Sequence, residues 1–481
     1  MDLKASAISG AKWTTLSSVS NALLQFLRIV ILARLLEKSD FGLMAIVAMI
    51  MGFTSLFTDM GIGTAILHKQ EISDKEYNSL YWMNFFISIF LFIIIFLLSF
   101  AVAEFYREPQ LKSLIPLMGV NLLFIAIGRQ YALIAQKKLQ FKFISITEIS
   151  TNLLSLFPAV FLAVKGYGVY SLIYSTLFAS LFSNLLFVIK MRNAFKLSFH
   201  FRFLETISFL KIGVFYTGGQ ILNYFNTQFD VILLGRLLGT DLLGTYNLCK
   251  NLAMRPAQII NPIITKISAP LLAKMQDDYS SLKRNFLIII RILSLINYPI
   301  YFMLAVLSPQ IIRIVYGIND PKTNLTFSFL ALYYMLRSTG NPISGLVIAK
   351  GRTDIEFYWN VGITLFFPLF IYLGAFYSTI GVASSQFLLM VLAIVPSWYF
   401  LIRKLTHTLL SEYVMQMLPY LFYSLIAGGI TFFVIKIFVD MPDILSASLG
   451  FIIFTVIYGT FIYFMNKKTV EFLNLLLTDW R

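Results

Sequence analysis

Long apolar stretches, each separated from the next by a short polar segment, run along almost the whole chain of 481 residues. A helix that crosses a membrane needs about 20 mainly apolar residues. The stretches that meet this requirement are 13–36, 41–66, 80–103, 113–136, 144–164, 167–190, 209–234, 241–267, 285–308, 325–349, 356–378, 380–402, 415–438 and 444–466. The pattern therefore predicts an all-α integral membrane protein with about 14 transmembrane helices.

Polar residues within some of these stretches recur at helical spacing, so that they share one helix face. The first stretch carries Thr14, Ser18, Asn21, Gln25 and Arg28 at intervals of three or four residues. The seventh repeats the spacing with Tyr216, Gln220, Asn223, Thr227 and Asp230, and the eighth with Asn247, Asn251, Gln258 and Asn261, where Arg255 lies close to that face. Such residues can join neighbouring membrane helices, but rows that include Gln and a charge favour the lining of a wet cavity.

Composition supports the membrane assignment. Hydrophobic residues make up 58% of the chain and charged residues only 13%, which is too little polar surface for a soluble protein of this size. The only cysteine, Cys249, excludes an internal disulfide and a cysteine-rich metal site. All three histidines fall in or beside connecting segments, so we expect neither a metal site nor a histidine proton relay inside the membrane.

The net charge of +15 could indicate a nucleic-acid partner, but its distribution argues against one. If the N-terminus is inside, most Lys and Arg residues fall in inner connecting segments, for example Lys137, Lys138 and Lys142. This distribution follows the positive-inside rule of membrane proteins. It predicts that both termini are cytoplasmic and that no nucleic acid is bound.

A weak internal repeat divides the chain. Arg34-Leu35-Leu36, followed by Gly42, recurs as Arg236-Leu237-Leu238, followed at the same distance by Gly244. The segment 135–143 likewise resembles 349–357. We therefore expect two six-helix lobes in parallel orientation, 1–200 and 201–405, around a central cavity that forms the substrate path. Residues 406–481 would form a C-terminal helical hairpin and a cytoplasmic end.

Ionisable residues inside the apolar stretches need a specific reason, because each costs roughly 2.5–3.5 kcal/mol on insertion scales. The cations are Arg28, Arg129, Lys250, Arg255, Lys266, Arg291 and Arg337, and the anions are Asp59, Glu148 and Asp230. Arg129 and Glu148 lie near the cytoplasmic ends of consecutive stretches, where an ion pair is favoured. Arg28, Arg255 and Arg337 lie near mid-membrane, where contact with an anionic substrate is favoured, because a guanidinium grips phosphate through two parallel hydrogen bonds.

Motifs of enzymes are absent from the sequence. There is no GxxxxGK[ST] phosphate loop, no acidic DxD pair on a loop, and no long outer loop rich in Arg and His. These are the features expected of an ATPase, a metal-dependent sugar transferase and a glycan polymerase. We therefore expect a transporter without catalytic residues, and not an enzyme.

Four segments resemble the polysaccharide transporter family of the MOP flippase superfamily, whose Wzx-like members export lipid-linked sugar units. They are LARLLEKSDFGLMAIV (32–47), TDMGIGTAILHKQEIS (58–73), FYREPQL (105–111) and YALIAQKKLQFK (131–142), and Ala33 to Gly42 carries the pattern A-R-x-L-x3-D-[FY]-G. The resemblance implies two six-helix lobes plus helices 13 and 14, with a cavity lined by helices 1, 2, 7 and 8. It also implies substrate binding by Arg28, because related lipid II flippases have first-helix arginines at a similar spacing from the Arg34 position.

The expected function is that of a flippase. It would move an undecaprenyl-pyrophosphate-linked oligosaccharide across the bacterial inner membrane by alternating access, for O-antigen lipopolysaccharide, capsule or exopolysaccharide synthesis. The substrate-binding residues would be Arg28, Arg255 and Arg337 for the charge and Asn21, Gln25, Asn223, Asn251 and Gln258 for the sugars. Besides membrane lipid, a polysaccharide polymerase or chain-length regulator is a candidate partner.

The alternative is a cation-coupled multidrug exporter of the same superfamily. Such an exporter needs a carboxylate that binds the coupling ion within the membrane, and Asp230 and Asp59 are the candidates. Coupling to H⁺ or Na⁺ at these residues would also suit a flippase, so the charge of the substrate distinguishes the two hypotheses. No other cofactor is expected.

Overall fold

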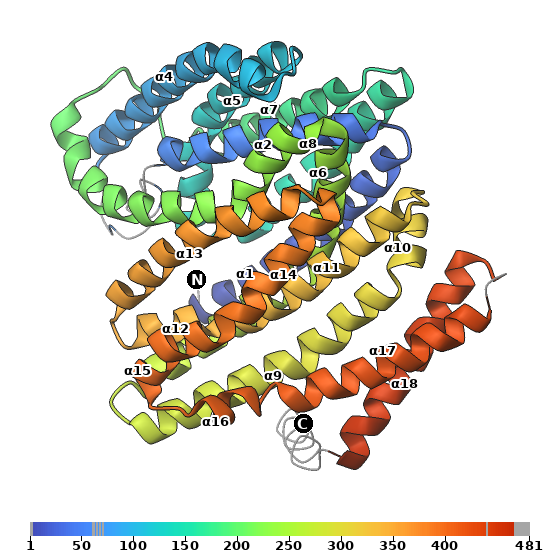
Figure 1. The fold of residues 1–481 in the computed structure, drawn as a ribbon. Helices are drawn as coiled ribbons and strands as arrows, with labels where there is room; N and C mark the ends of the chain where they lie inside the picture. The colour runs from blue at the N-terminus through green and yellow to red at the C-terminus, as the bar shows by residue number, and fades with distance from the viewer. Residues whose placement is uncertain are drawn as a thin grey trace. The chain divides into compact units, whose positions relative to one another are not determined.

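The computed structural model describes residues 3–59, 63, 66, 69, 72–438 and 441–465. All of their regular elements are helical, and none of the described residues forms a strand (Figure 1). The contacts divide the chain into two compact units, unit 1 (1–244) and unit 2 (245–481). The predicted all-α class is confirmed. The predicted lobe boundaries at 200 and 405 rest on the sequence repeat and stay a prediction.

Unit 1 is built from long helices that pack both on their neighbours in sequence and on helices further along the chain. Helix α4 packs on α5, α5 on α7, α7 on α6, and α6 on α1. The helices are α1 (Leu3–Ala33), α2 (Lys38–Asp59), α4 (Asp74–Tyr106), α5 (Leu111–Lys137), α6 (Phe141–Val164), α7 (Val169–Met191) and the first part of α8 (Phe203–Lys274). This arrangement places α1 beside α6, which positions the candidate site.

Helix α8 changes direction at a glycine. Gly239 has φ 81° and ψ 176°, which is not a helical conformation and which glycine adopts without strain. The two parts of α8 on either side of Gly239 contain the predicted stretches 209–234 and 241–267. Pro256 and Pro262 lie inside the second part, and the helix continues through both.

Unit 2 contains shorter helices and a terminal hairpin. Helix α14 packs on α11 and α13, α11 packs on α9, and the hairpin of α17 and α18 packs on α9. The elements are α9 (Tyr279–Val306), α10 (Ser308–Tyr316), α11 (Pro321–Thr339), α12 (Pro342–Ala349), α13 (Thr353–Ala375), α14 (Ser378–Ser397), the π-helical turn η1 (Trp398–Ile402), α15 (Arg403–Thr406), α16 (Leu410–Val414), α17 (Leu418–Ile437) and α18 (Asp443–Met465).

Eleven helices among the described residues are long and apolar enough to cross a membrane. The predicted number of 14 is not confirmed. The stretches 209–234, 241–267 and 325–349 are not among the eleven. The third is divided between α11 and α12, because the helix breaks at Gly340 and Asn341 before Pro342. Asp241, Lys250, Arg255 and Lys266 raise the charge of the second.

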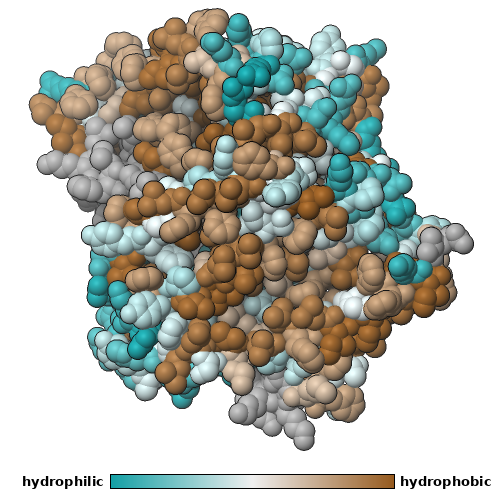
Figure 2. Space-filling view, in the orientation of Figure 1, coloured by the Kyte–Doolittle hydropathy of each residue, from teal (hydrophilic) through white to brown (hydrophobic). Residues whose placement is uncertain are grey.

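The outer surfaces of these helices are hydrophobic. Large side chains such as Phe157, Leu365 and Phe433 are 68–75% exposed. In unit 2, Figure 2 shows hydrophobic side chains over α9, α13 and α14, with hydrophilic side chains gathered mainly towards helix ends. Exposed apolar surface on this scale requires a lipid environment. The chain is a multi-pass membrane protein.

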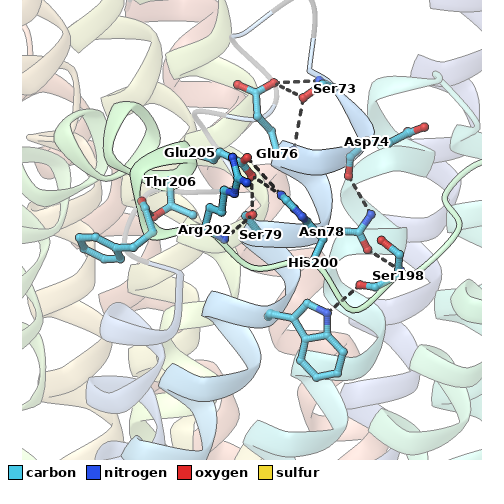
Figure 3. Close-up of polar contacts among 12 residues, drawn as sticks. Ser73, Asp74, Glu76, Asn78, Ser79, Ser198, His200, Arg202, Glu205 and Thr206 are labelled. Carbon is cyan, nitrogen blue, oxygen red and sulfur yellow. Dashed lines mark hydrogen bonds and ion pairs between the residues drawn. The ribbon is translucent and has the colours of Figure 1, made fainter.

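The connection between α7 and α8 is held against the start of α4 (Figure 3). The indole Nε1 of Trp82 donates to the carbonyl of Ser198 at 2.9 Å, and the backbone N–H of Ser198 donates to Asn78 Oδ1 at 2.6 Å. Because Asn78 and Trp82 occupy successive turns of α4, the connecting segment is fixed along that helix.

Glu205, in the first turn of α8, extends this attachment (Figure 3). The buried Ser79 hydroxyl donates to Glu205 Oε2 at 2.6 Å and accepts from the backbone N–H of Arg202 at 3.0 Å. His200 Nε2 lies 3.1 Å from the same carboxylate. The hydrogen bonds from Ser79 and His200, with the nearby charge of Arg202, hold the pKa of Glu205 below its usual value. The carboxylate therefore favours the attached connection when it is ionised.

Candidate functional site

Helix α1 exposes two opposite faces of different character. On one face lie the predicted polar residues, of which Thr14, Ser18 and Gln25 are exposed and Asn21 and Arg28 are partly buried. On the other face, an apolar row is 39–58% exposed, namely Leu16, Val19, Leu23, Leu27 and Ile31. The helical period places the two rows on opposite sides. A helix with a lipid-compatible face and an accessible polar face is suited to border an aqueous path in a membrane.

Glu148 of α6 joins the polar face of α1. The buried Ser17 hydroxyl donates to Glu148 Oε2 at 2.6 Å, and Asn21 Nδ2 donates to the same oxygen at 3.3 Å. Asn152, one turn further along α6, donates to Asn21 Oδ1 at 2.9 Å. We expected Arg129 to be the partner of Glu148. In the structure, the carboxylate of Glu148 accepts from these neutral donors of α1. Glu148 thus presents an exposed carboxyl group beside the polar face of α1, held there by the hydroxyl of Ser17 and the amide of Asn21.

Arg28 is held by α7. Its Nη2 donates to Ser175 Oγ at 2.6 Å, with longer contacts to the Leu172 carbonyl at 3.3 Å and Thr176 Oγ1 at 3.4 Å. Among the described residues, Nη2 is the only one of its three guanidinium nitrogens with a hydrogen bond to the protein. The guanidinium is thus oriented by one nitrogen, and Nε and Nη1 are available to an anionic group.

Only part of the polar row predicted in the seventh stretch lies among the residues whose side chains the structure describes. The side chain of Asn223, predicted to bind substrate, lies outside the described residues, and so does that of Asp59, predicted to couple an ion. Asp230, the other predicted coupling residue, is only 3% exposed, and its Oδ1 accepts from the backbone N–H of Val231 at 2.8 Å. Its carboxyl group is therefore buried within unit 1.

Unit 2 contributes four predicted site residues. Arg255 is partly buried, and its Nη1 lies 3.4 Å from Oε1 of the exposed Gln258, one turn away. Asn251, one turn before Arg255, is partly buried. Arg337 is exposed, and its Nη1 donates to the Tyr333 hydroxyl at 2.6 Å. Arg337 lies in the last turn of α11, just before the break at Gly340.

The structure adds residues that the sequence did not indicate. Asn152 and Ser175 complete the polar contacts of Asn21 and Arg28 from helices α6 and α7. The signal for Asn152 was its spacing of four residues from Glu148, which places both on one face of α6. Ser175 had no distinctive signal. In the described part of the chain, no group of three His, Cys, Asp or Glu residues could hold a metal ion.

Comparisons with known proteins agree with this architecture. A family model described as polysaccharide biosynthesis protein matches residues 31–319. The lipopolysaccharide biosynthesis protein WzxC of Escherichia coli (strain K12) is 31% identical over 431 residues, which cover 87% of this chain and 86% of WzxC.

Solved structures share the fold at low sequence identity. The lipid II flippase MurJ in an inward closed conformation gives a TM-score of 0.76 at 16% identity, covering 95% of this chain and 99% of MurJ. An inward-facing MATE multidrug resistance transporter of the MOP superfamily gives 0.60 at 15% identity, covering 79% and 93%. At this level of identity the likeness concerns the fold alone.

Proposed function

Because the chain belongs to the polysaccharide biosynthesis protein family and is a membrane transporter of the flippase type, we propose that it moves undecaprenyl-pyrophosphate-linked oligosaccharides across the bacterial inner membrane. The units would serve O-antigen, capsule or exopolysaccharide synthesis. Both termini would be cytoplasmic, and the protein would work by alternating access. A polysaccharide polymerase or chain-length regulator would receive the exported units.

The observation that carries this proposal is the division of α1 into two exposed faces. Its polar row, Thr14 to Arg28, offers hydroxyl, amide and guanidinium groups to a hydrated glycan. Its apolar row, Leu16 to Ile31, offers a surface that an isoprenoid chain can follow within the bilayer. A substrate with a polar head and a long lipid tail needs both surfaces at the same depth.

The arginines have separate roles in this proposal. Arg28, held to Ser175 by one nitrogen, directs its remaining donors to the pyrophosphate or to an acidic sugar. Arg255 and Arg337 of unit 2 would supply further positive charge to the anionic substrate. Asn21, Gln25, Asn223, Asn251 and Gln258 bind sugar hydroxyl groups, because amides both donate and accept hydrogen bonds.

The energy source in this proposal is an ion gradient that acts through a membrane carboxylate. Asp230 is the preferred coupling residue, because its carboxyl group is buried within a predicted membrane stretch, where an ionisable side chain needs a specific reason. Asp59 is the second candidate. The coupling ion would be H⁺ or Na⁺.

Reconstitution in liposomes tests the proposal. Purified protein should move a lipid-linked oligosaccharide between leaflets, measured by the fraction that becomes accessible to an external glycosidase. Arg255→Ala should lower this transfer strongly, while Lys274→Ala, which changes an exposed cation at the end of the same helix, should not. No transfer of any lipid-linked glycan, together with uptake of a small organic cation, would replace the flippase by the multidrug exporter.

A further inference from the structure

A pocket of about 300 Å³ lies in unit 2 between α10 and the hairpin of α17 and α18. It is situated where α9 ends at Val306, where α17 ends at Ile437 and where α18 begins at Asp443. All three positions are also ends of candidate membrane spans. The pocket therefore lies at the depth of the lipid headgroups, on the side that the predicted topology assigns to the outer leaflet.

Two polar side chains of α10 line this pocket and have unused hydrogen-bonding atoms. Gln310 is only 9% exposed, and its Nε2 donates to Ser446 of α18 at 3.3 Å. Its Oε1 is buried and has no donor among the described protein atoms. The buried Nε of Arg313 likewise has no acceptor among the described protein atoms, although its Nη1 lies 3.3 Å from Asp443 Oδ1. An unpaired buried polar group costs roughly 1–3 kcal/mol.

The two unused atoms have opposite requirements. Arg313 Nε needs an acceptor, and Gln310 Oε1 needs a donor. Lys436, at the end of α17, is exposed and adds a second cation to the lining, so that with Asp443 the pocket has an excess of one positive charge. The complementary ligand is an anionic acceptor that carries a hydrogen-bond donor a few atoms away.

The rest of the lining is hydrophobic and continues onto the lipid-facing surface. Val306 and Phe432 contribute apolar walls. Outside the pocket, Ile437 is 75% exposed and Ile444 is 67% exposed, so the hairpin offers an apolar surface directly beside the polar groups. Acyl chains attached to the ligand can follow this surface.

We propose that this pocket binds a membrane phospholipid whose phosphate contacts Arg313 and Lys436 and whose ammonium or hydroxyl group donates to Gln310 Oε1. The lipid joins α10 to the terminal hairpin, because its headgroup contacts residues of α10 and α17 at once. A free phosphate ion could contact the same polar groups, but it has no apolar part to lie against the hydrophobic walls at Val306 and Phe432. The proposal does not depend on what the protein transports.

Lipid binding to the purified full chain tests this inference, with native mass spectrometry counting bound lipids. Phosphatidylethanolamine and phosphatidylglycerol both carry a headgroup donor, and phosphatidylcholine has neither N–H nor O–H. We expect the first two to bind roughly two- to tenfold more tightly than phosphatidylcholine, which is the range of one hydrogen bond. Equal binding of all three lipids would overturn the assignment.

Two variants and one control locate the site. Lys436→Ala, at an exposed position where folding is not at risk, should weaken binding of every phospholipid about fivefold. Gln310→Leu should remove the preference over phosphatidylcholine. Lys322→Ala changes an exposed lysine of the same unit that does not line the pocket, and should bind lipids as the unmodified protein does.

A competition experiment distinguishes a membrane phospholipid from the transported polyprenyl lipid as the source of the phosphate group in the pocket. Added polyprenyl pyrophosphate should leave phosphatidylethanolamine bound. Displacement of phosphatidylethanolamine would assign the pocket to the transported lipid and contradict the proposal, as would unchanged binding in Lys436→Ala. Because these measurements involve no transport, their failure is distinguishable from failure of the proposed flippase activity.

Discussion

Gly42 of α2 and Gly244 of α8 lie against each other in unit 1. A Cβ atom at Gly244 would overlap the carbonyl oxygen of Lys38 and lie 2.9 Å from the backbone nitrogen of Gly42. A Cβ atom at Gly42 would overlap the carbonyl of Thr240. The two glycines hold equivalent places in the sequence repeat, so the repeat preserves a position where two helix backbones approach closely.

Substitution of either glycine should destabilise the protein. Gly42→Ala or Gly244→Ala forces a methyl group against backbone atoms, which have little freedom to move, and overpacking of this kind costs about 1–3 kcal/mol. Thermal unfolding of the purified protein measures the effect. Gly429→Ala is the control, because that helical glycine has open space around it and alanine is the better helix former there. An unfolding midpoint unchanged by Gly244→Ala would show that the backbones can separate.

The contact between Ser17 and Glu148 should contribute to stability. Truncation of Glu148 leaves the buried Ser17 hydroxyl without its acceptor. A double-mutant cycle of Ser17→Ala and Glu148→Ala should give a coupling free energy of about 1 kcal/mol, since part of the carboxylate is solvated. Ser18→Ala is the matched control, because Ser18 bonds within its own helix, to the Thr14 carbonyl. Equal coupling for Ser17 and Ser18 would refute a direct contribution.

Arg28 and Ser175 should differ in their effect on transport. Arg28→Ala removes the charge that we assign to the substrate anion, and should lower the flipping rate roughly ten- to hundredfold. Ser175→Ala keeps the charge of Arg28 and removes only the shortest hydrogen bond of its guanidinium. We therefore expect the flipping rate to fall roughly two- to tenfold. Both rates are measured in liposomes, beside Lys12→Ala as a cation control on α1. If Ser175→Ala reduced the rate as far as Arg28→Ala, orientation and not charge would be decisive.

Asp230→Asn should separate coupling from transport. Asparagine keeps an acceptor for the Val231 N–H but cannot ionise. We expect gradient-driven accumulation to fall to the level found without a gradient, while exchange of substrate at equilibrium continues. Asp241→Asn, at an exposed carboxylate of the same helix, provides the control. Gradient-driven accumulation that survives in Asp230→Asn would exclude Asp230 as the coupling residue.

The α7–α8 connection should loosen in acid. Because the pKa of Glu205 is lowered in the folded protein, its ionised form stabilises the attachment above the usual value of 4.5. This contribution is lost as the pH falls through the lowered folded-state pKa. Emission of Trp82, whose indole bonds to Ser198, should report the change. The Trp82→Phe variant shows which part of the change in emission comes from Trp82.

Glu205→Gln should not show this acid transition, since the group that titrates is gone. At neutral pH its connecting segment should already exchange amide hydrogens faster than that of the unmodified protein. Glu104→Gln, an exposed carboxylate at the other end of α4, serves as the comparison. The same acid transition in Glu205→Gln and in the unmodified protein would assign the signal to another group.

The membrane class and the polar row of α1 could be read from the sequence, because each depends on residues close together in the chain. Apolar length and helical period are local properties. The predicted count of 14 was not confirmed, because charges such as Lys250 and Arg255 lower the mean apolarity of a stretch without preventing a helix.

Partners of the functional side chains were decided only by the tertiary structure. The sequence placed Arg28 and Glu148 in the membrane, but Ser175 and Ser17 became their partners because α7 and α6 pack near α1. The same holds for the pocket at Gln310, whose lining comes from α9, α10, α17 and α18. Hydrogen bonds between helices depend on which faces meet, and many helix arrangements are compatible with one pattern of apolar stretches. The sequence by itself thus determined the helices and their polar faces, and the packing decided which charges are held and which remain available to a substrate.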